Sequence, residues 1–208
     1  MIIRKIFPFL LIALLTSCAV SNHSSVLKQT QENPFNRILI LLSDDDLKLT
    51  TFDSAFYTNH IQDHFNTLEG IRYRNHLEKT FQRNLESKGT VIIKSADVFP
   101  VNDPIPYLDF REALDSLQIH AVLVINLREY WTTLFYDQNS QVSAEPNASF
   151  NTYLIRLSDD QIVWMGNTIV NGIYAGYDTI NNTLARKIAA SLRKHKLIYP
   201  ADPTIRNK

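Results

Sequence analysis

The pattern of apolar and polar positions along the chain predicts a set of strands separated by helices. Two apolar runs without alternation have the length of strands that are covered on both faces of a sheet. A third, longer segment begins fully apolar and then alternates, which predicts a strand whose first half is central and whose second half projects past its neighbours. The last two strands flank a tight turn at residues 158–161. The predicted strands are, in chain order, 36–42, 91–94, 120–135, 149–157 and 162–170.

Helical periodicity fills the intervals between these strands. Leu77, Phe81 and Leu85 recur every four residues with polar residues between them, and Gly89 provides a stop signal. The predicted helices cover residues 54–65, 73–87, 107–117 and 179–196, and a polar loop is predicted at 137–147.

This order of elements predicts the α/β (α+β) class, with a single mixed sheet of about five strands and helices packed on it. Helical crossovers between the early strands make them parallel neighbours, and the late hairpins make antiparallel ones. A single domain accounts for residues 35–200, and residues 201–208 form a polar tail.

The first residues have the three parts of an export signal. Arg4 and Lys5 form a positive region, residues 6–15 form an apolar run, and the small residues that follow end at Cys18. Ten helical residues span about 15 Å, half of the ~30 Å hydrocarbon core of a bilayer. Residues 1–17 are therefore predicted to be a cleaved signal peptide rather than a transmembrane helix.

The sequence Leu15-Thr16-Ser17-Cys18 resembles a bacterial lipobox. The resemblance implies that the thiol of Cys18 is diacylated and that Cys18 becomes the first residue of the mature protein, anchored in a membrane by its acyl chains. Ala19 follows where inner-membrane lipoproteins of the enteric type carry Asp, which implies the outer membrane, facing the periplasm. Residues 18–34 are then the lipidated cysteine and a flexible tether with a span of about 20–25 Å.

Composition narrows the possible partners. The 208 residues contain 21 Lys plus Arg and 21 Asp plus Glu, and a zero net charge argues against a nucleic-acid binder. Loss of Arg4 and Lys5 with the signal peptide takes this balance from zero to about −2, so nothing attracts the body to anionic lipid. A single cysteine excludes an internal disulfide and a zinc site with several cysteines.

Three segments of the body resemble a loose group of bacterial envelope lipoproteins. This group includes the penicillin-binding-protein activators, the curli-secretion lipoproteins and the amino-terminal domain of the Tol translocation protein. The segments are the strand at 120–125, the hairpin at 154–164 and the closing helix at 184–192. The hairpin departs from the group because Asp160-Gln161 stands in place of a glycine-containing turn. The resemblance implies a protein without enzymatic activity that acts through contacts with other envelope proteins.

His60 and His64 form the strongest candidate for metal chemistry. They are spaced i and i+4, which places them on one face of the segment if it is helical. With Asp63 they form the order His-x-x-Asp-His, which is similar to an inverted zinc-protease motif. Glu69 and His76 are candidate third ligands by proximity alone. If the two histidines bind a metal ion, the protein is a metal-dependent hydrolase instead of a non-enzymatic binding protein. The simpler interpretation is that both are polar residues on a solvated helix face.

Asp44, Asp45 and Asp46 follow the first predicted strand, where an open α/β sheet binds ligands and where carboxylates can hold Mg²⁺. They are equally suited to capping a helix or forming a turn. The sequence has no Gly-x-Ser-x-Gly motif, Walker loop or dinucleotide fingerprint. We therefore expect no cofactor and no catalytic residue.

Tyr130, Trp131, Phe135 and Tyr136 lie in the projecting half of the long strand. Exposed aromatic residues at the end of a sheet are typical of a surface for a protein partner or a glycan. The alternative is that every second one belongs to the core. Further aromatic residues expected nearby are Trp164, Tyr174 and Tyr177. The expected partner is an envelope protein, with a glycan or small ligand as the alternative.

Overall fold

The computed structural model describes residues 21–26, 33–43, 49, 51–136, 142–171 and 176–201. The predicted signal peptide, the lipobox with Cys18, the Asp44–Asp46 run and most of the polar tail lie outside the described residues. No helix in the described part of the chain is long and apolar enough to span a membrane.

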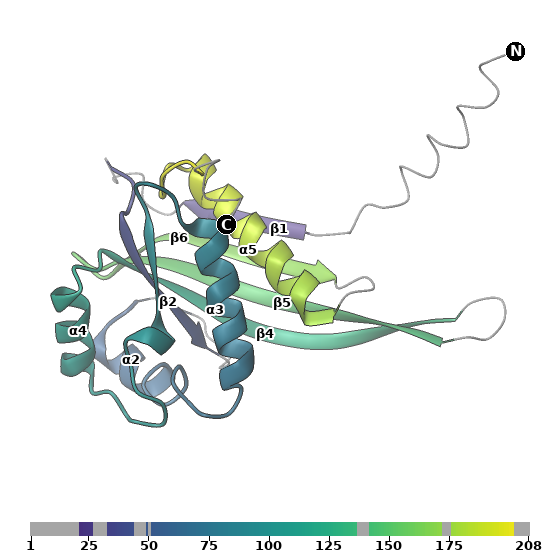
Figure 1. Cartoon of the computed structure of the whole chain (residues 1–208), viewed down its shortest axis with the longest axis horizontal. Coiled ribbons are helices and arrows are strands. Elements are labelled where there is room, and N and C mark those ends of the chain that lie inside the picture. Colours follow the sequence, from purple (N-terminus) through teal and green to yellow (C-terminus); the bar gives the residue numbers. More distant parts are fainter. Residues whose placement is uncertain are drawn as a thin grey trace, which may run out of the picture.

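The fold is a single mixed sheet with helices packed on it, as predicted (Figure 1). Six strands lie in the order β1-β6-β5-β4-β2-β3. β2 is parallel to β3 and to β4, whereas β4, β5, β6 and β1 form antiparallel pairs. The strands are β1 (Ser21–Val26), β2 (Arg37–Ser43), β3 (Val91–Lys94), β4 (Ala121–Tyr136), β5 (Val142–Arg156) and β6 (Gln161–Asn171).

Helices cover both faces of the sheet around β2. Ile38, Ile40 and Leu42 belong to a core shared with α3 (Ile71–Leu85) and α5 (Gly176–Lys194). Leu39 and Leu41 point to the opposite face, into a core shared with α2 (Ser54–His60) and α4 (Tyr107–Ser116). A short 3₁₀ helix, η2 (Ser95–Asp97), follows β3. The uninterrupted apolar run of β2 is therefore explained by burial on both faces.

The sixth strand, β1, lies within the segment that we predict as a flexible tether. It pairs with the edge of β6, from Ser21 opposite Ile169 to Val26 opposite Trp164. Its side chains are mostly polar, and an edge strand with one face in solvent can be held by its backbone hydrogen bonds alone. Hydropathy therefore gave no signal for β1, and the prediction of about five strands omitted it.

The hairpin of β4 and β5 extends well past α3 and α5 (Figure 1). β4 is fully buried at its start and exposed towards its end, which confirms the predicted projecting half. The loop predicted at 137–147 is shorter, since β5 begins at Val142, opposite Tyr136. Pro146 is uncommon inside a strand, and it lies where the described part of β5 pairs with β4 but not with β6.

The helix predicted at 54–65 ends early. α2 begins after Asp53, whose carboxylate accepts a hydrogen bond from the N–H of Phe56 at 2.8 Å, and it ends at His60. Residues 61–66 form turns instead. Ile61 and Phe65 are buried there without a helix, so their apolar spacing reflects packing rather than helical periodicity.

Candidate functional site

The four aromatic residues predicted as a partner surface all lie on the projecting part of the hairpin. Tyr130, Phe135 and Tyr136 are 43%, 50% and 71% exposed, and Trp131 is partly exposed. None of the four belongs to a buried core cluster. The interpretation of every second residue as core is therefore wrong for this segment, because no helix among the described residues covers it.

Alternation along β4 divides these residues between the two faces of the hairpin. Tyr130 and Tyr136 share one face, and Trp131 and Phe135 share the other. Leu134, which is 53% exposed, lies between the two tyrosines on their face and was missed because it is not aromatic. The four aromatic residues thus form two surfaces rather than one cluster.

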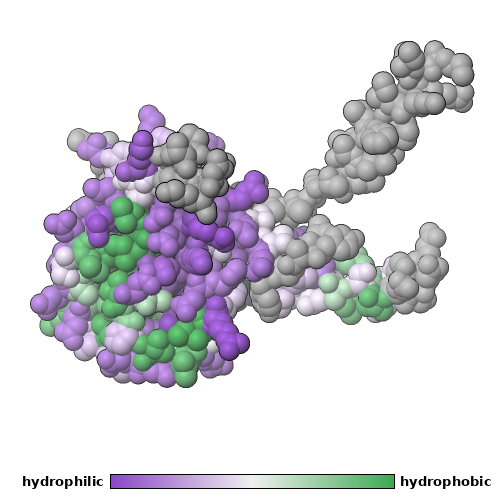
Figure 2. All heavy atoms as spheres, viewed as in Figure 1, coloured by the Kyte–Doolittle hydropathy of each residue, from purple (hydrophilic) through white to green (hydrophobic). Residues whose placement is uncertain are grey.

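The face with Tyr130 and Tyr136 carries a continuous apolar stripe. Each member on β4 is paired with a small or apolar residue on β5, and only Thr132 interrupts the row. Figure 2 shows apolar surface on the hairpin, separate from the apolar patches on the body. The apolar stripe consists of Tyr130, Leu134, Tyr136, Val142, Ala144, Pro146 and Ala148.

The apolar stripe leads into a pocket of about 650 Å³ where the hairpin leaves the body. This root pocket combines residues from the sheet and from both helices of that face. At its mouth, Nε2 of His76 on α3 lies 2.9 Å from Oδ1 of Asp178 on α5. The lining residues are Arg72, Tyr73, His76, Leu127, Tyr130, Ala148, Asp178 and Ile180.

The opposite face of the sheet carries a row of polar side chains in register across five strands. Asn167 donates from Nδ2 to Oδ1 of Asn151 at 2.9 Å, and Asn126 donates from Nδ2 to the carbonyl of Ser43 at 3.2 Å. A pocket of about 250 Å³ opens at the β1 end of the row. This amide row consists of Ser43, Asn126, Asn151, Asn167 and His23.

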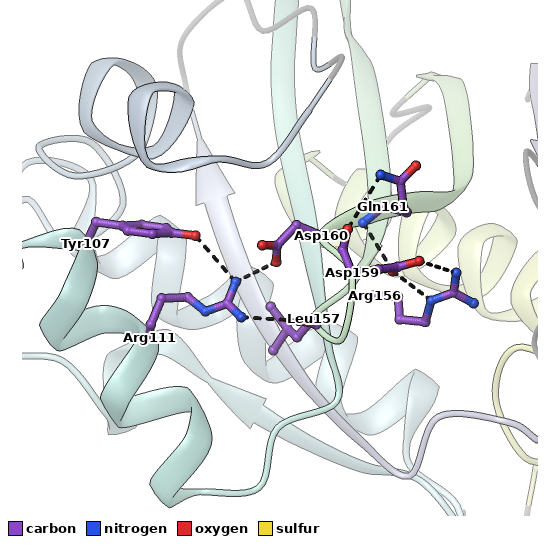
Figure 3. Close-up of polar contacts among 7 residues, drawn as sticks. All are labelled: Tyr107, Arg111, Arg156, Leu157, Asp159, Asp160 and Gln161. Carbon is purple, nitrogen blue, oxygen red and sulfur yellow. Dashed lines mark hydrogen bonds and ion pairs between the residues drawn. The ribbon is translucent and has the colours of Figure 1, made fainter.

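At the other end of the sheet, α4 holds the turn between β5 and β6 (Figure 3). Arg111 donates to Oδ1 of Asp160 at 2.5 Å and to the carbonyl of Leu157 at 3.1 Å. Arg156 contacts Asp159 at 2.6 Å. Asp160 has a φ of 53°, the left-handed conformation that glycine otherwise supplies in such a turn, and Asp tolerates it better than most residues. Asp160 thus takes the place of glycine in this turn, and its carboxylate accepts a hydrogen bond from Arg111.

The histidine pair does not share a helical face. His60 is the last residue of α2, with its ring 4.9 Å from that of Phe56, and His64 is exposed in the turn that follows. Within the described ranges, no group of three or more His, Cys, Asp or Glu side chains is placed to hold a metal ion. The proposed third ligand His76 lies instead at the root pocket, beside Asp178.

Trp164 does not lie with the exposed aromatic residues. It is fully buried, and its indole N–H donates to Oγ of Ser191 on α5 at 3.2 Å. Tyr174 and the side chain of Tyr177 lie outside the described residues.

No protein-family profile and no curated protein matches the sequence. Among solved structures, the chain is similar to the PelC dodecamer from Paraburkholderia phytofirmans, with 12% identity, a TM-score of 0.48, and coverage of 82% of this chain and 95% of that one. It is also similar to lipoprotein GNA1162 from Neisseria meningitidis, with 13% identity, a TM-score of 0.36, and coverage of 76% and 99%. A PDZ domain protein from Parabacteroides distasonis has 10% identity and a TM-score of 0.38, and 93% of this chain matches 40% of that one. Similarities of this size concern the path of the chain and carry no functional information.

Proposed function

We propose that this chain is a lipid-anchored protein of the bacterial envelope, placed in the outer membrane and facing the periplasm. In this proposal it acts without catalysis, by binding another envelope protein through the root pocket. The observation that carries the proposal is the apolar pocket at the base of an exposed hairpin, on a body preceded by a lipobox.

The sequence before the body supports the anchoring. Leu15-Thr16-Ser17-Cys18 follows a positive and an apolar region at the spacing of lipoprotein signals. Each buried methylene group contributes about 0.8 kcal/mol to membrane binding. Two or three acyl chains therefore hold a protein stably in the membrane, whereas binding through a single chain is reversible.

The lining of the root pocket supports a protein partner. Tyr73, Leu127 and Ile180 offer apolar contact inside it, and charged side chains stand at its mouth. An apolar centre within a polar rim is the usual anatomy of a protein interface, where one large side chain of the partner fills a pocket and supplies much of the affinity. Tyr130 and Ala148, the members of the apolar stripe that line the pocket, extend this contact area onto the base of the hairpin.

Site-specific photo-crosslinking tests the proposal in cells. A photoreactive phenylalanine analogue replaces Tyr130, which lines the root pocket, and in a control strain it replaces Leu108, which is 77% exposed on α4 at the other end of the sheet. We expect a discrete adduct with one envelope protein from position 130 and none from position 108. Equal background at both positions would count against partner binding at this pocket.

The amide row favours a second candidate function, the binding of a neutral glycan. Asn is depleted in strands, yet Asn151 and Asn167 lie side by side on one face and line the pocket at the β1 end of the row, whereas Asn126 is buried. Amides donate and accept hydrogen bonds without charge, which suits sugar hydroxyl groups. A glycan ligand raises the melting temperature of the protein, so thermal unfolding with a panel of neutral oligosaccharides tests this function. Stabilisation that disappears in Asn151→Ala, Asn167→Ala would support it, and no shift with any of them would contradict it.

A further inference from the structure

The register of the sheet fixes the end of the sheet at which β1 begins. Ser21, the first residue of β1, pairs with Ile169, which pairs with Ser149, which pairs with Glu129. These residues form one row across four strands. Because each neighbouring pair is antiparallel, β1 begins at the end of the sheet towards which β4 runs after Glu129. The projecting hairpin and the first residue of β1 therefore lie at the same end of the sheet (Figure 1).

The hairpin reaches further in this direction than the chain that precedes β1. From Glu129 to Tyr136, β4 advances by seven residues, or about 23 Å at ~3.3 Å each. Cys18 is three residues before Ser21, which spans about 10 Å when fully extended. With its acyl chains in a bilayer, Cys18 holds the row of Glu129 within about 10 Å of the membrane surface. A hairpin that continues in the same direction meets that surface.

The side chains in this distal part suit the boundary between lipid headgroups and acyl chains. Leu134, Phe135, Tyr136 and Val142 are each at least half exposed and occupy both faces of the hairpin. Aromatic and aliphatic side chains favour that boundary. The sequence at 137–141 is Asp-Gln-Asn-Ser-Gln, which favours an interfacial position over passage through the hydrocarbon core.

Charge also distinguishes apolar insertion from attraction to anionic lipid. Residues 129–147 include Glu129, Asp137 and Glu145 but no Lys or Arg. Juxtamembrane segments that bind anionic lipid are rich in Lys and Arg. Contact by this hairpin therefore depends on its apolar side chains and not on the headgroup charge.

We propose that the distal hairpin, residues 132–136 and 142–146, docks into the interface of the same bilayer that holds the acyl chains of Cys18. The proposal rests on the lipid anchoring proposed above and deepens it. Two membrane contacts, one from the lipid and one from the hairpin, fix the orientation of the body. The root pocket then lies close to the membrane surface, where it meets a partner that is itself in or on the membrane.

A fluorescent label on the hairpin tests this docking. Phe135→Cys in the full lipidated chain carries one free thiol, since the sulfur of Cys18 is acylated, and this thiol takes an environment-sensitive fluorophore. The matched control is Leu108→Cys on α4, an exposed position at the opposite end of the sheet. Both proteins are reconstituted into phosphatidylcholine vesicles, with or without lipids that carry a nitroxide quencher on the acyl chain.

We expect emission from position 135 to shift to shorter wavelength on reconstitution and to lose most of its intensity with the nitroxide lipid. Position 108 shows neither change, and addition of anionic lipid does not increase the effect at 135. Emission at 135 that matches the control at 108 would overturn the proposal. So would a spectral shift without lipid quenching, which is the outcome expected if a protein covers the hairpin. Failure of the anchoring itself is recognised separately, because Cys18 then lacks acyl mass and takes the fluorophore.

Discussion

Glu78 is a carboxyl group that the fold buries completely, where α3 meets η2. Ser95 donates a short hydrogen bond to one of its oxygens, and the backbone N–H of Ala96 donates to the other at 3.2 Å. Burial raises the pKa of Glu78. These two hydrogen bonds and the charges of Arg74 and Lys94 oppose this rise without cancelling it.

This burial makes stability depend on pH. Because the pKa of Glu78 is higher in the folded than in the unfolded chain, the folded state holds the proton more tightly. The contribution is fully present at acid pH and is lost as pH rises through the folded pKa. We expect Glu78→Gln to flatten this fall in the free energy of unfolding, measured by urea titration between about pH 4 and pH 8. The exposed control Glu112→Gln should keep the wild-type slope, and the same slope in Glu78→Gln would contradict the assignment.

Gly89 is required by a close contact rather than by its backbone conformation. A Cβ at this position would overlap the ring of Tyr199. The backbone N–H of Tyr199 donates a hydrogen bond to Oγ1 of Thr90 at 3.1 Å. We expect Gly89→Ala to lower the free energy of unfolding by about 1–3 kcal/mol, the usual cost of overpacking. In a Tyr199→Ala background the same substitution should cost much less. An equal cost in both backgrounds, measured by denaturant unfolding, would exclude the ring contact as the cause.

At the scale of elements, the strands buried on both faces and the long helices were predictable, because their apolar patterns are determined by the cores they enter. Leu77, Phe81 and Leu85 lie buried on α3 as their spacing predicts. Edge elements were not predictable. β1 and the first part of β5 are held by backbone pairing with a neighbour, and their polar side chains and Pro146 resemble those of a loop.

The candidate site also has one part that the sequence predicted and one part that it did not. Exposed aromatic residues on the projecting half of β4 follow from the change in its pattern, so Tyr130, Trp131, Phe135 and Tyr136 were found. The root pocket was not, because it forms only when α3 and α5 bring Tyr73, His76 and Ile180 to the base of the hairpin. No local pattern encodes a juxtaposition of residues that lie so far apart in the sequence.

The contact between α4 and the β5–β6 turn provides a prediction at this scale. Arg111→Ala removes the bonds to Asp160 and to the carbonyl of Leu157. We expect a loss of about 1–2 kcal/mol in the free energy of unfolding, because both bonds are charge-assisted but partly exposed to solvent. Asp160→Ala weakens the turn by itself and should reduce the effect of a second Arg111→Ala substitution. Strict additivity in this double-mutant cycle would show that the two side chains are not coupled.

At the scale of the whole molecule, β1 takes up part of the segment predicted as a tether. The predicted tether spans residues 18–34, but β1 already begins at Ser21. Cys18 is three positions before Ser21, a reach of about 10 Å at most when extended, in place of the 20–25 Å expected for a flexible coil. In the proposed anchored state, the sheet stands next to the membrane with its hairpin directed towards it.

Lipidation of Cys18 is the central claim, since both the localisation and the orientation of the body depend on it. The most direct measurement is mass spectrometry of the intact chain recovered from membranes, beside a Cys18→Ser strain. We expect a chain that begins at Cys18 and carries the added mass of its acyl chains, and a Cys18→Ser variant that is neither acylated nor processed at this site. A membrane-bound wild-type chain with an unmodified Cys18 would contradict it.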